Sequence, residues 1–403
     1  KRGRDGAGND IGPSAPDSKR SRSGEPQAAN ARPYTVEDVP EKVVARLVHT
    51  GPISAVVFRP GFSTMCLAGT ETGATSLWNV ATEQLIAAYN PHAGAVKCLT
   101  WALDGSVVFA VGYSEPEVHV VEVGTDEYGL VRCKLVCALH GHTAAVNDVV
   151  FVRISDKDGS PKTVIITGSD DHTIRVADPL TGALLHNFEG HKGPVYSLCP
   201  QHRAHSQFTF SMSEDGFIRA WLFDGTGCCL RNATPGKCCT WMAYCADGTR
   251  LFSCGIASSE RQANLVEWNE SEGTIKQEFA GFVNEDEKVA RFETLGNRFL
   301  VLSDGPVVKV WDMDSPEVVK TIQHPDFALS APLRANGTGT LMAVGGKDNT
   351  LLILSNAQGE RYLSPQASTP ESEPGDNDSG TQQLMQQQQQ HPHIQQQQQQ
   401  QQQ

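Results

Sequence analysis

Short apolar stretches recur along the chain, and seven of them end in a similar way before a polar turn. "TSLWNV", "IRAWLFD" and "VKVWDMD" are examples. The residues that close the seven stretches are Trp78, Val121, Ala177, Trp221, Trp268, Trp311 and Leu354, at intervals of 43, 56, 44, 47, 43 and 43 residues. Short runs of this kind between turn residues predict β-strands. Their near-constant spacing predicts an internal repeat.

A second set of marks recurs inside the repeat. "FEGHKGPVYSL" carries a Gly-His pair, Asp215 follows His191 by 24 residues, and Trp221 follows Asp215 by 6. A period of about 40 to 45 residues with Gly-His and Trp-Asp marks is typical of WD repeats, each of which forms one four-stranded propeller blade. The interval of 56 contains two polar insertions, at residues 124–129 and 155–161. We therefore predict an all-β fold, a seven-bladed WD-repeat β-propeller.

The two ends of the repeat region predict how the ring closes. A strand-like run at residues 42–49 precedes the first complete repeat, whereas the last repeat ends near Leu354 after three strands. We expect the early run to complete the seventh blade, because pairing would remove two open sheet edges.

The chain divides by composition into three parts. Residues 1–33 are rich in Gly, Ser, Pro and charge, and we predict a disordered basic linker whose "KRGR" and "SKRSR" clusters resemble a bipartite nuclear localisation signal. Residues 34–356 form the predicted propeller. Residues 357–403 are predicted to be a disordered Gln-rich tail, with 16 Gln among the last 22 residues. Because the first residue is Lys, we expect the chain to be a piece of a longer one.

The Gly-His and Asp marks have a catalytic and a structural interpretation. In the fourth repeat we expect a hydrogen-bonded brace made of His191, Ser211, Asp215 and Trp221, in which every buried polar atom has a partner. The third repeat keeps three members of such a brace, His142, Thr167 and Asp171, with Ala177 at the Trp position. A catalytic pair is expected once, whereas a brace recurs from blade to blade. The recurrence favours the structural interpretation.

Other signals of chemistry are weak. The chain has no nucleophile elbow, HExxH motif or phosphate loop, and we predict neither an enzyme nor a cofactor. Two possible metal sites, the paired cysteines Cys228-Cys229 and Cys238-Cys239 and the "HRAH" stretch at residues 202–205, lack the usual ligand spacing. No apolar run approaches the length of a membrane helix, and we expect a soluble intracellular protein. The net charge of −13 argues against direct nucleic-acid binding by the propeller.

Several stretches resemble one family in particular. "TVEDVPEKVVARL", "FEGHKGPVYSLCP", "CADGTRLFSCG" and "LVEWNESEGTIK" are similar to the first propeller of the plant Topless and Topless-related transcriptional corepressors. The resemblance runs from about Thr35 to Leu354. It implies a nuclear, non-enzymatic scaffold that links DNA-bound repressors to histone deacetylase complexes in hormone and developmental gene repression. The helical N-terminal region and the second propeller of that family are not found in this sequence, and the Gln-rich tail departs from the family.

A different class of function remains open. Substrate receptors of cullin ubiquitin ligases are also intracellular WD-repeat proteins. They usually carry Trp-Asp-x-Arg at a strand end, whereas the strand ends here read "WDMD", "WNVA", "WNES" and "WLFD". We keep the receptor as the alternative function.

Acidic residues gather at one position of the repeat, the turn between its second and third strands. We expect four of them to face solvent at one mouth of the funnel: Glu71, Glu115, Asp170 and Glu214. One interpretation is a solvated and partly structural rim. The other is a negative mouth that attracts basic peptides such as histone tails, weakly and with strong salt dependence.

Overall fold

The computed structural model describes residues 33–91, 94–103, 105–155, 160–201, 208–222, 228–233, 238–256, 263–284, 290–329 and 331–363. Side chains are described for these residues except 155, 228–233, 238 and 256. Both predicted tails fall mostly outside these ranges, so their predicted disorder stays a prediction there. Residues 357–363, predicted to belong to the disordered C-terminal tail, are ordered and include a short helix at Gly359–Leu363.

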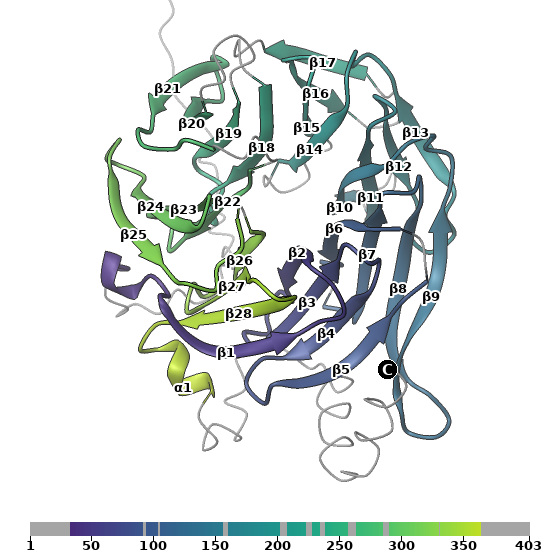
Figure 1. Ribbon diagram of the computed structural model, residues 1–403. Coiled ribbons are helices and arrows are strands. Elements are labelled where there is room, and N and C mark those ends of the chain that lie inside the picture. Colours follow the sequence, from purple (N-terminus) through teal and green to yellow (C-terminus); the bar gives the residue numbers. More distant parts are fainter. Residues whose placement is uncertain are drawn as a thin grey trace, which may run out of the picture. The chain divides into compact units, whose positions relative to one another are not determined.

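The described strands form seven four-stranded antiparallel sheets, arranged as blades around one axis (Figure 1). Blade 1 contains β2 (Ile53–Phe58), β3 (Met65–Thr70), β4 (Thr75–Asn79) and β5 (Gln84–Tyr89). Blade 2 contains β6 (Val96–Trp101), β7 (Val108–Tyr113), β8 (Val118–Thr125) and β9 (Val131–Leu139). Blade 3 contains β10 (Val146–Ser155), β11 (Pro161–Ser169), β12 (Ile174–Ala177) and β13 (Leu184–Phe188). Blade 4 contains β14 (Val195–Pro200), β15 (Phe208–Ser213), β16 (Ile218–Leu222) and β17 (Cys228–Ala233).

The remaining blades follow the same order. Blade 5 contains β18 (Cys238–Tyr244), β19 (Leu251–Ile256), β20 (Ala263–Asn269) and β21 (Thr274–Glu278). Blade 6 contains β22 (Phe292–Leu295), β23 (Phe299–Asp304), β24 (Val307–Asp312) and β25 (Val318–Gln323). Blade 7 contains β26 (Leu333–Ala335), β27 (Leu341–Gly345), β28 (Thr350–Ser355) and β1 (Lys42–Val48). The predicted seven-bladed fold is confirmed.

Blade 7 joins the two ends of the propeller. Its first three strands come from the end of the repeat region, and β1 pairs with β28 from Lys42 opposite Ser355 to Val48 opposite Thr350. The sequence-based prediction that residues 42–49 close the ring is therefore confirmed, apart from His49, which follows the strand. Two sheet edges that would otherwise be open are paired.

A β-bulge recurs in the first, innermost strand of five blades. The pairing register slips by one residue near the start of β2, β6, β10, β14 and β18. The residues left unpaired there are Ser54, Lys97, Asn147, Tyr196 and Thr240. Bulges bend a strand and re-aim a side chain. Each of these residues lies near the end of the axis where the chain enters its blade.

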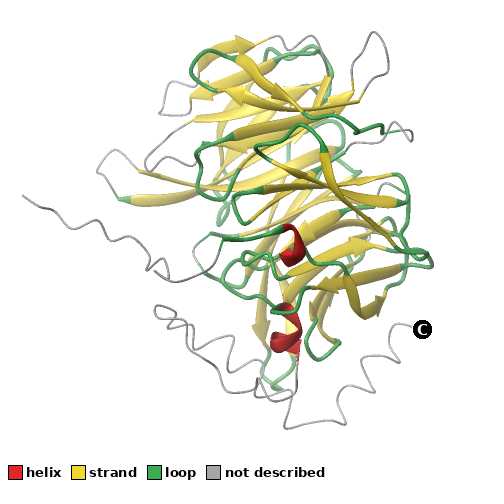
Figure 2. Ribbon diagram, turned by 90° about the vertical axis from the view of Figure 1, so that its left-hand side faces the viewer, coloured by secondary structure: helices red, strands yellow, loops and turns green. Residues whose placement is uncertain are grey.

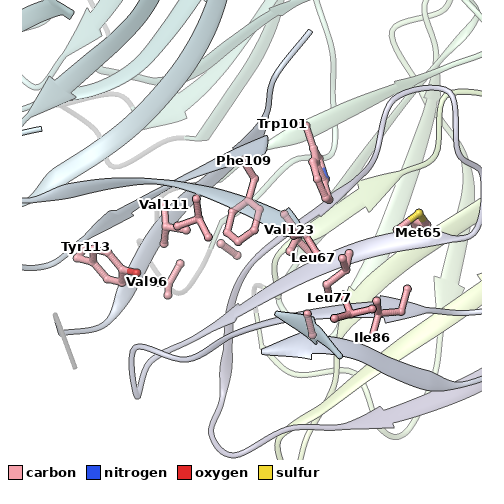
Figure 3. Close-up of a cluster of buried hydrophobic side chains, with 14 residues drawn as sticks. Met65, Leu67, Leu77, Ile86, Val96, Trp101, Phe109, Val111, Tyr113 and Val123 are labelled. Carbon is pink, nitrogen blue, oxygen red and sulfur yellow. The ribbon is translucent and has the colours of Figure 1, made fainter. Parts of the chain in front are cut away.

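The core lies between neighbouring blades. Figure 3 shows the cluster shared by blades 1 and 2, where Leu67 and Leu77 of blade 1 meet Trp101 and Phe109 of blade 2. Glycine lets the sheets approach closely: a Cβ on Gly69 would lie 2.4 Å from a methyl carbon of Val96 in the next blade. Because each blade buries its faces against its neighbours, the ring stabilises every blade in it.

Two short helices, drawn in red in Figure 2, flank the two strands that close the ring along the chain. The 3₁₀ helix η1 (Val36–Asp38) precedes β1, and α1 (Gly359–Leu363) follows β28. The Asn356 amide donates to the carbonyl oxygen of Asp38 (2.5 Å), and Lys42 Nζ pairs with Glu360 (2.7 Å). Among the described residues, none of the helices has the length and apolar character needed to cross a membrane.

Candidate functional site

Blade 4 brings together the four residues that the sequence groups as a brace. His191 lies before β14, Ser211 on β15, Asp215 in the following turn and Trp221 on β16. His191 Nδ1 lies 3.0 Å from an Asp215 carboxylate oxygen, and Nε2 lies 2.7 Å from Ser211 Oγ. The indole Nε1 of Trp221 donates to the same hydroxyl at 2.7 Å. The four side chains thus form one continuous chain of hydrogen bonds.

The partners determine which atoms carry hydrogen. A carboxylate only accepts, so His191 Nδ1 donates to Asp215, and Nε2 must accept from Ser211. The Ser211 hydroxyl can then accept from Trp221, and each polar atom of the chain is satisfied. Burial lowers the pKa of His191, with opposition from Asp215, which favours the neutral ring that this pattern needs.

Asp215 also holds the turn in place. Its carboxylate accepts from the backbone N–H groups of Lys192 (2.9 Å) and Phe217 (3.0 Å). Desolvation raises the pKa of Asp215, but the hydrogen bonds from Lys192, His191 and Phe217 outweigh it, so the pKa lies below its usual value. The carboxylate therefore ties the loop before β14 to the turn before β16.

Blade 3 contains the same arrangement without the indole. His142 Nδ1 lies 2.8 Å from Asp171 Oδ2, and Nε2 lies 2.8 Å from Thr167 Oγ1. Thr173 Oγ1 donates to Asp171 at 2.7 Å. Ala177 stands at the Trp position, as the sequence indicates.

Blade 1 has the two rings but not the hydroxyl between them. His49 and Trp78 have ring centroids 5.4 Å apart at 56°, close to the 5.9 Å and 62° of His191 and Trp221. Ala68 occupies the place of Ser211, because each pairs with the residue two before the Trp. Among the described atoms, His49 Nε2 and Trp78 Nε1 are both buried without a hydrogen-bond partner. The repeat pattern of the sequence does not indicate this pair, because the hydroxyl that would link the two rings is absent.

Blade 5 satisfies its indole as blade 4 does, because Ser253 pairs with the residue two before Trp268, whereas blade 6 uses a backbone carbonyl. Trp268 Nε1 donates to Ser253 Oγ (2.8 Å), and Trp311 Nε1 donates to the carbonyl oxygen of Ala280 (2.6 Å). In blade 6, Asp304 accepts from the backbone N–H of Asn284 (2.8 Å) and from Lys309 Nζ (2.6 Å). The Trp–Ser bond of the brace is therefore kept in blades 4 and 5, whereas blade 3 keeps the His–Asp pair without a Trp.

The acidic turns between the second and third strands share one backbone contact. The N–H of Glu71 donates to the Pro52 carbonyl (2.9 Å), as Asp170 does to Ala145 (2.9 Å) and Glu214 to Pro194 (3.0 Å). Each turn is thereby fixed beside the loop that enters the first strand of its blade. The acids extend from equivalent points on blades 1, 3 and 4.

The four predicted rim acids differ in environment. Glu71, Glu115 and Glu214 are exposed. Asp170 is half-buried, and its carboxylate accepts from the Asn147 amide at 2.6 Å, so the expectation that it faces solvent freely is wrong. In blade 2 the shared backbone contact belongs to Ser114, so Glu115 lies one position later than the other three. We call these four residues the acidic arc.

The acidic arc covers blades 1 to 4. The corresponding turn of blade 7 holds Lys347 beside Asp348, and that of blade 6 begins at the buried Asp304. Glu260 of blade 5 lies outside the described residues. Two cations, the exposed Lys97 and the partly exposed Arg291, lie at the starts of first strands, at the same end of their blades. The mouth is therefore acidic on part of its rim and basic nearer the axis.

Sequence reasoning missed one polar chain between blades 1 and 2. Tyr89 Oη lies 2.9 Å from His119 Nδ1, and His119 Nε2 lies 3.2 Å from Glu117 Oε2. His119 is buried and also packs edge-on against the ring of Tyr113. A single buried His on a strand has no distinctive spacing, which is why the repeat pattern did not reveal it.

Among the described side chains, no group of three or more His, Cys, Asp or Glu is placed to hold a metal ion. Cys239 is buried, while the side chains of the other three paired cysteines and the stretch at 202–205 lie outside the described part.

The comparisons with known proteins agree with the fold. The family model "WD domain, G-beta repeat" matches residues 133–178 and 182–221. The crystal structure of the WD40 beta propeller domain of Doa1 superposes with a TM-score of 0.61 at 17% identity, covering 79% of this chain and 97% of that one. At this identity the superposition shows the fold alone.

Sequence similarity is higher to one set of plant proteins. Topless-related protein 4 of Arabidopsis thaliana is 37% identical over 82% of this chain, and Protein TOPLESS-RELATED PROTEIN 2 of Oryza sativa subsp. japonica is 37% identical over 86%. Protein TOPLESS of Arabidopsis thaliana is 35% identical over 81%. The matched region covers only 30%, 32% and 30% of these relatives. Over this segment, about a third of its relatives' length, the chain belongs to the Topless-related family.

Proposed function

We propose that this propeller is a non-enzymatic protein-interaction scaffold of a nuclear transcriptional corepressor. The proposal rests on similarity to Topless-related proteins over most of the chain. Its partners would be transcriptional repressors and chromatin-modifying proteins, including histone deacetylase complexes. Repression of hormone-responsive and developmental genes is the finer form of the same proposal.

We further propose that the acidic arc binds Lys/Arg-rich segments such as histone tails. The observation that carries this is the exposure of Glu71, Glu115 and Glu214 on the turns of blades 1, 2 and 4 at one face. The turns of Glu71 and Glu214 share the same backbone contact, and the brace of blade 4 adds a second tie beside Glu214. Rigid acids on one face raise the local concentration of a basic ligand.

The test is a charge reversal of the three exposed acids. We expect the triple variant Glu71→Lys, Glu115→Lys, Glu214→Lys to lose binding to a fluorescent histone H3 tail peptide at low salt. Asp170 is left unchanged because its bond to Asn147 is part of the fold. Wild-type binding should weaken steeply as salt rises, because exposed charges are screened.

The control reverses three exposed acids elsewhere, Glu122, Glu272 and Glu317. Glu272 and Glu317 lie in turns between third and fourth strands, at the other end of their blades. The control should retain binding at the same total charge. Equal loss in both triple variants would show that net charge alone attracts the peptide, and unchanged binding in the first variant would refute the acidic arc.

The corepressor role has its own test. The propeller tethered to a DNA-binding domain in plant cells should reduce expression of a reporter gene, and the acidic-arc variant should reduce it less. A tethered propeller that leaves the reporter unchanged, and that retains no chromatin-silencing proteins from nuclei, would contradict the role of this segment.

A further inference from the structure

An arginine crosses the axis of the propeller. Arg291 immediately precedes β22 in blade 6, and its Nη2 donates to the carbonyl oxygen of Asn147 in blade 3 at 3.0 Å, a contact between residues 144 positions apart. Asn147 is the bulge residue of β10, and its amide donates to Asp170 of the acidic arc. The guanidinium therefore lies near the axis, at the end of the funnel where the acidic arc begins.

Among the described residues, no carboxylate forms a direct ion pair with Arg291. The nearby Arg334 of β26 pairs with Glu293 at 2.7 Å. The buried carboxylate of Asp148 instead accepts from the backbone N–H groups of Leu198 (2.8 Å) and Val149 (3.0 Å). Among the described residues, Arg291 forms no ion pair and donates one hydrogen bond, to Asn147. Burial lowers the pKa of Arg291, and the negative charge of buried Asp148 opposes that effect without a direct contact. The guanidinium therefore keeps N–H donors that no described carboxylate accepts from.

Trp241 of β18 lies against both arginines. The guanidinium carbons of Arg291 and Arg334 each lie 4.7 Å from its ring centroid. Its Nε1 is buried without a hydrogen-bond partner among the described atoms. The cation–π contacts with Trp241 stabilise both guanidinium groups at this end of the axis.

A second cation lies close by. Lys97, the bulge residue of β6, is exposed and has no ion pair among the described residues. Burial and Asp148 raise the pKa of the Cys98 thiol, and Arg291 and Lys97 both oppose that rise. Lys97 and Arg291 lie at the same end of their blades, next to the starts of β6 and β22.

We propose that Arg291, supported by Trp241 and Arg334 and approached past Lys97, binds one carboxylate group of an extended partner peptide at the centre of the mouth. We call this set of four residues the axial site. A planar carboxylate can accept two parallel N–H bonds from a guanidinium. Glu293 pairs with Arg334, and buried Asp148 offsets part of the charge of Arg291, so the site offers a ligand no more than one positive charge next to Trp241. That favours a side-chain carboxylate over a phosphate, which the surrounding acidic arc would also repel.

The proposal makes a specific demand on the ligand. Residues that lie over the acidic arc should be neutral or basic, whereas the residue at the axis should be acidic. A peptide of basic residues with one central Glu fits both conditions, and its Gln counterpart fits only the first. The difference between the two peptides isolates the axial site, and the Gln peptide alone reports on the acidic arc.

The experiment measures binding of two fluorescent peptides, acetyl-KRGEGRK-amide and acetyl-KRGQGRK-amide, to the full chain at low salt. We expect the wild type to bind the Glu peptide about tenfold more tightly, the difference that one charge-assisted hydrogen-bonded pair makes. Arg291→Gln should abolish the preference without weakening the Gln peptide. Arg291→Lys, which keeps the charge but loses the planar fork, should retain part of it.

Arg132→Gln is the matched control, since Arg132 lies exposed on β9 and pairs with Asp126. It removes the same charge and should leave the preference unchanged. Equal affinity of wild type for the two peptides, or binding of neither, would overturn the proposal. A preference for the Glu peptide that survives in Arg291→Gln would also overturn it. Arg291 would then have only a structural role, as the contact with Asn147 across the axis.

Discussion

The two ring nitrogens left without partners in blade 1 are a weakness that one hydroxyl can remove. Ala68 lies where blade 4 has Ser211, between rings of nearly the same geometry. We expect Ala68→Ser to raise the free energy of unfolding by about 1 to 2 kcal/mol, because it gives His49 Nε2 a donor and Trp78 Nε1 an acceptor. Chemical denaturation of the variant and wild type measures the difference.

The reverse change in blade 4 is the control. Ser211→Ala removes the shared partner of His191 and Trp221 and should lower the free energy of unfolding by about 1 to 3 kcal/mol. Changes of the same sign in the two variants would show that the hydroxyl is not what the rings lack.

The buried histidines make stability depend on pH. Burial lowers the pKa of His49 to about 4 from 6.5, against a smaller opposing effect of its bond to the Leu47 carbonyl. Between these values the unfolded chain binds a proton that the folded chain does not, so stability is complete above pH 6.5 and falls as the pH drops toward 4. His142 and His191 act in the same direction.

Replacing His49 tests this dependence. His49→Phe keeps an aromatic ring and removes the titrating group, and we expect its unfolding free energy to fall less between pH 7 and pH 5. One group contributes at most about 1.4 kcal/mol per pH unit. Parallel curves for the variant and wild type would mean that His49 titrates alike in both states.

At the scale of the element, β1 should matter most for ring closure, because it is distant in sequence from the other three strands of its blade. Deleting residues 1–49 should leave β28 as an open edge whose residues Leu351 to Leu354 are fully buried in the intact ring. Such an edge pairs with other chains. We expect aggregation, seen as loss of the monomer peak in size-exclusion chromatography.

Deleting only residues 1–33 keeps β1 and should leave the monomer peak and the melting temperature unchanged. A soluble monomer with a cooperative melt after the longer deletion would show that the ring does not need this strand.

At the scale of the whole molecule, the blades depend on one another. Each interface is a shared apolar core, and polar links add to it: Arg250 of blade 5 pairs with Asp314 of blade 6 at 2.7 Å, and Arg59 of blade 1 donates to the Gly105 carbonyl at 2.6 Å. A ring of this kind should unfold as a unit.

Truncating one core side chain tests whether the ring unfolds as a single cooperative unit. Phe109→Ala, in the core between blades 1 and 2, should cost about 3 to 5 kcal/mol and shift the whole transition. Circular dichroism and tryptophan fluorescence should report the same midpoint. Val319→Ala on the exposed face of β25 should change it little. Separate midpoints for the two probes would show that blades melt independently.

The amino-acid sequence by itself determined whatever repeats within one blade. Strand positions, the number of blades and the partners of His191 and His142 follow from spacings of a few tens of residues, because a blade is built from consecutive strands. Closure by β1 could be predicted as well, since the last repeat lacks one strand.

Only the tertiary structure decided what lies between blades and across the axis. No repeat in the sequence predicts the contact of Arg291 with Asn147 or the position of Trp241 beside two arginines. The same is true of the ring nitrogens of His49 and Trp78 that have no partner among the described atoms. Contacts of this kind depend on how seven sheets are turned toward one another. The same holds for Asp170. The sequence predicts that it faces solvent on the rim, but its carboxylate accepts a hydrogen bond from Asn147, the bulge residue of the neighbouring strand.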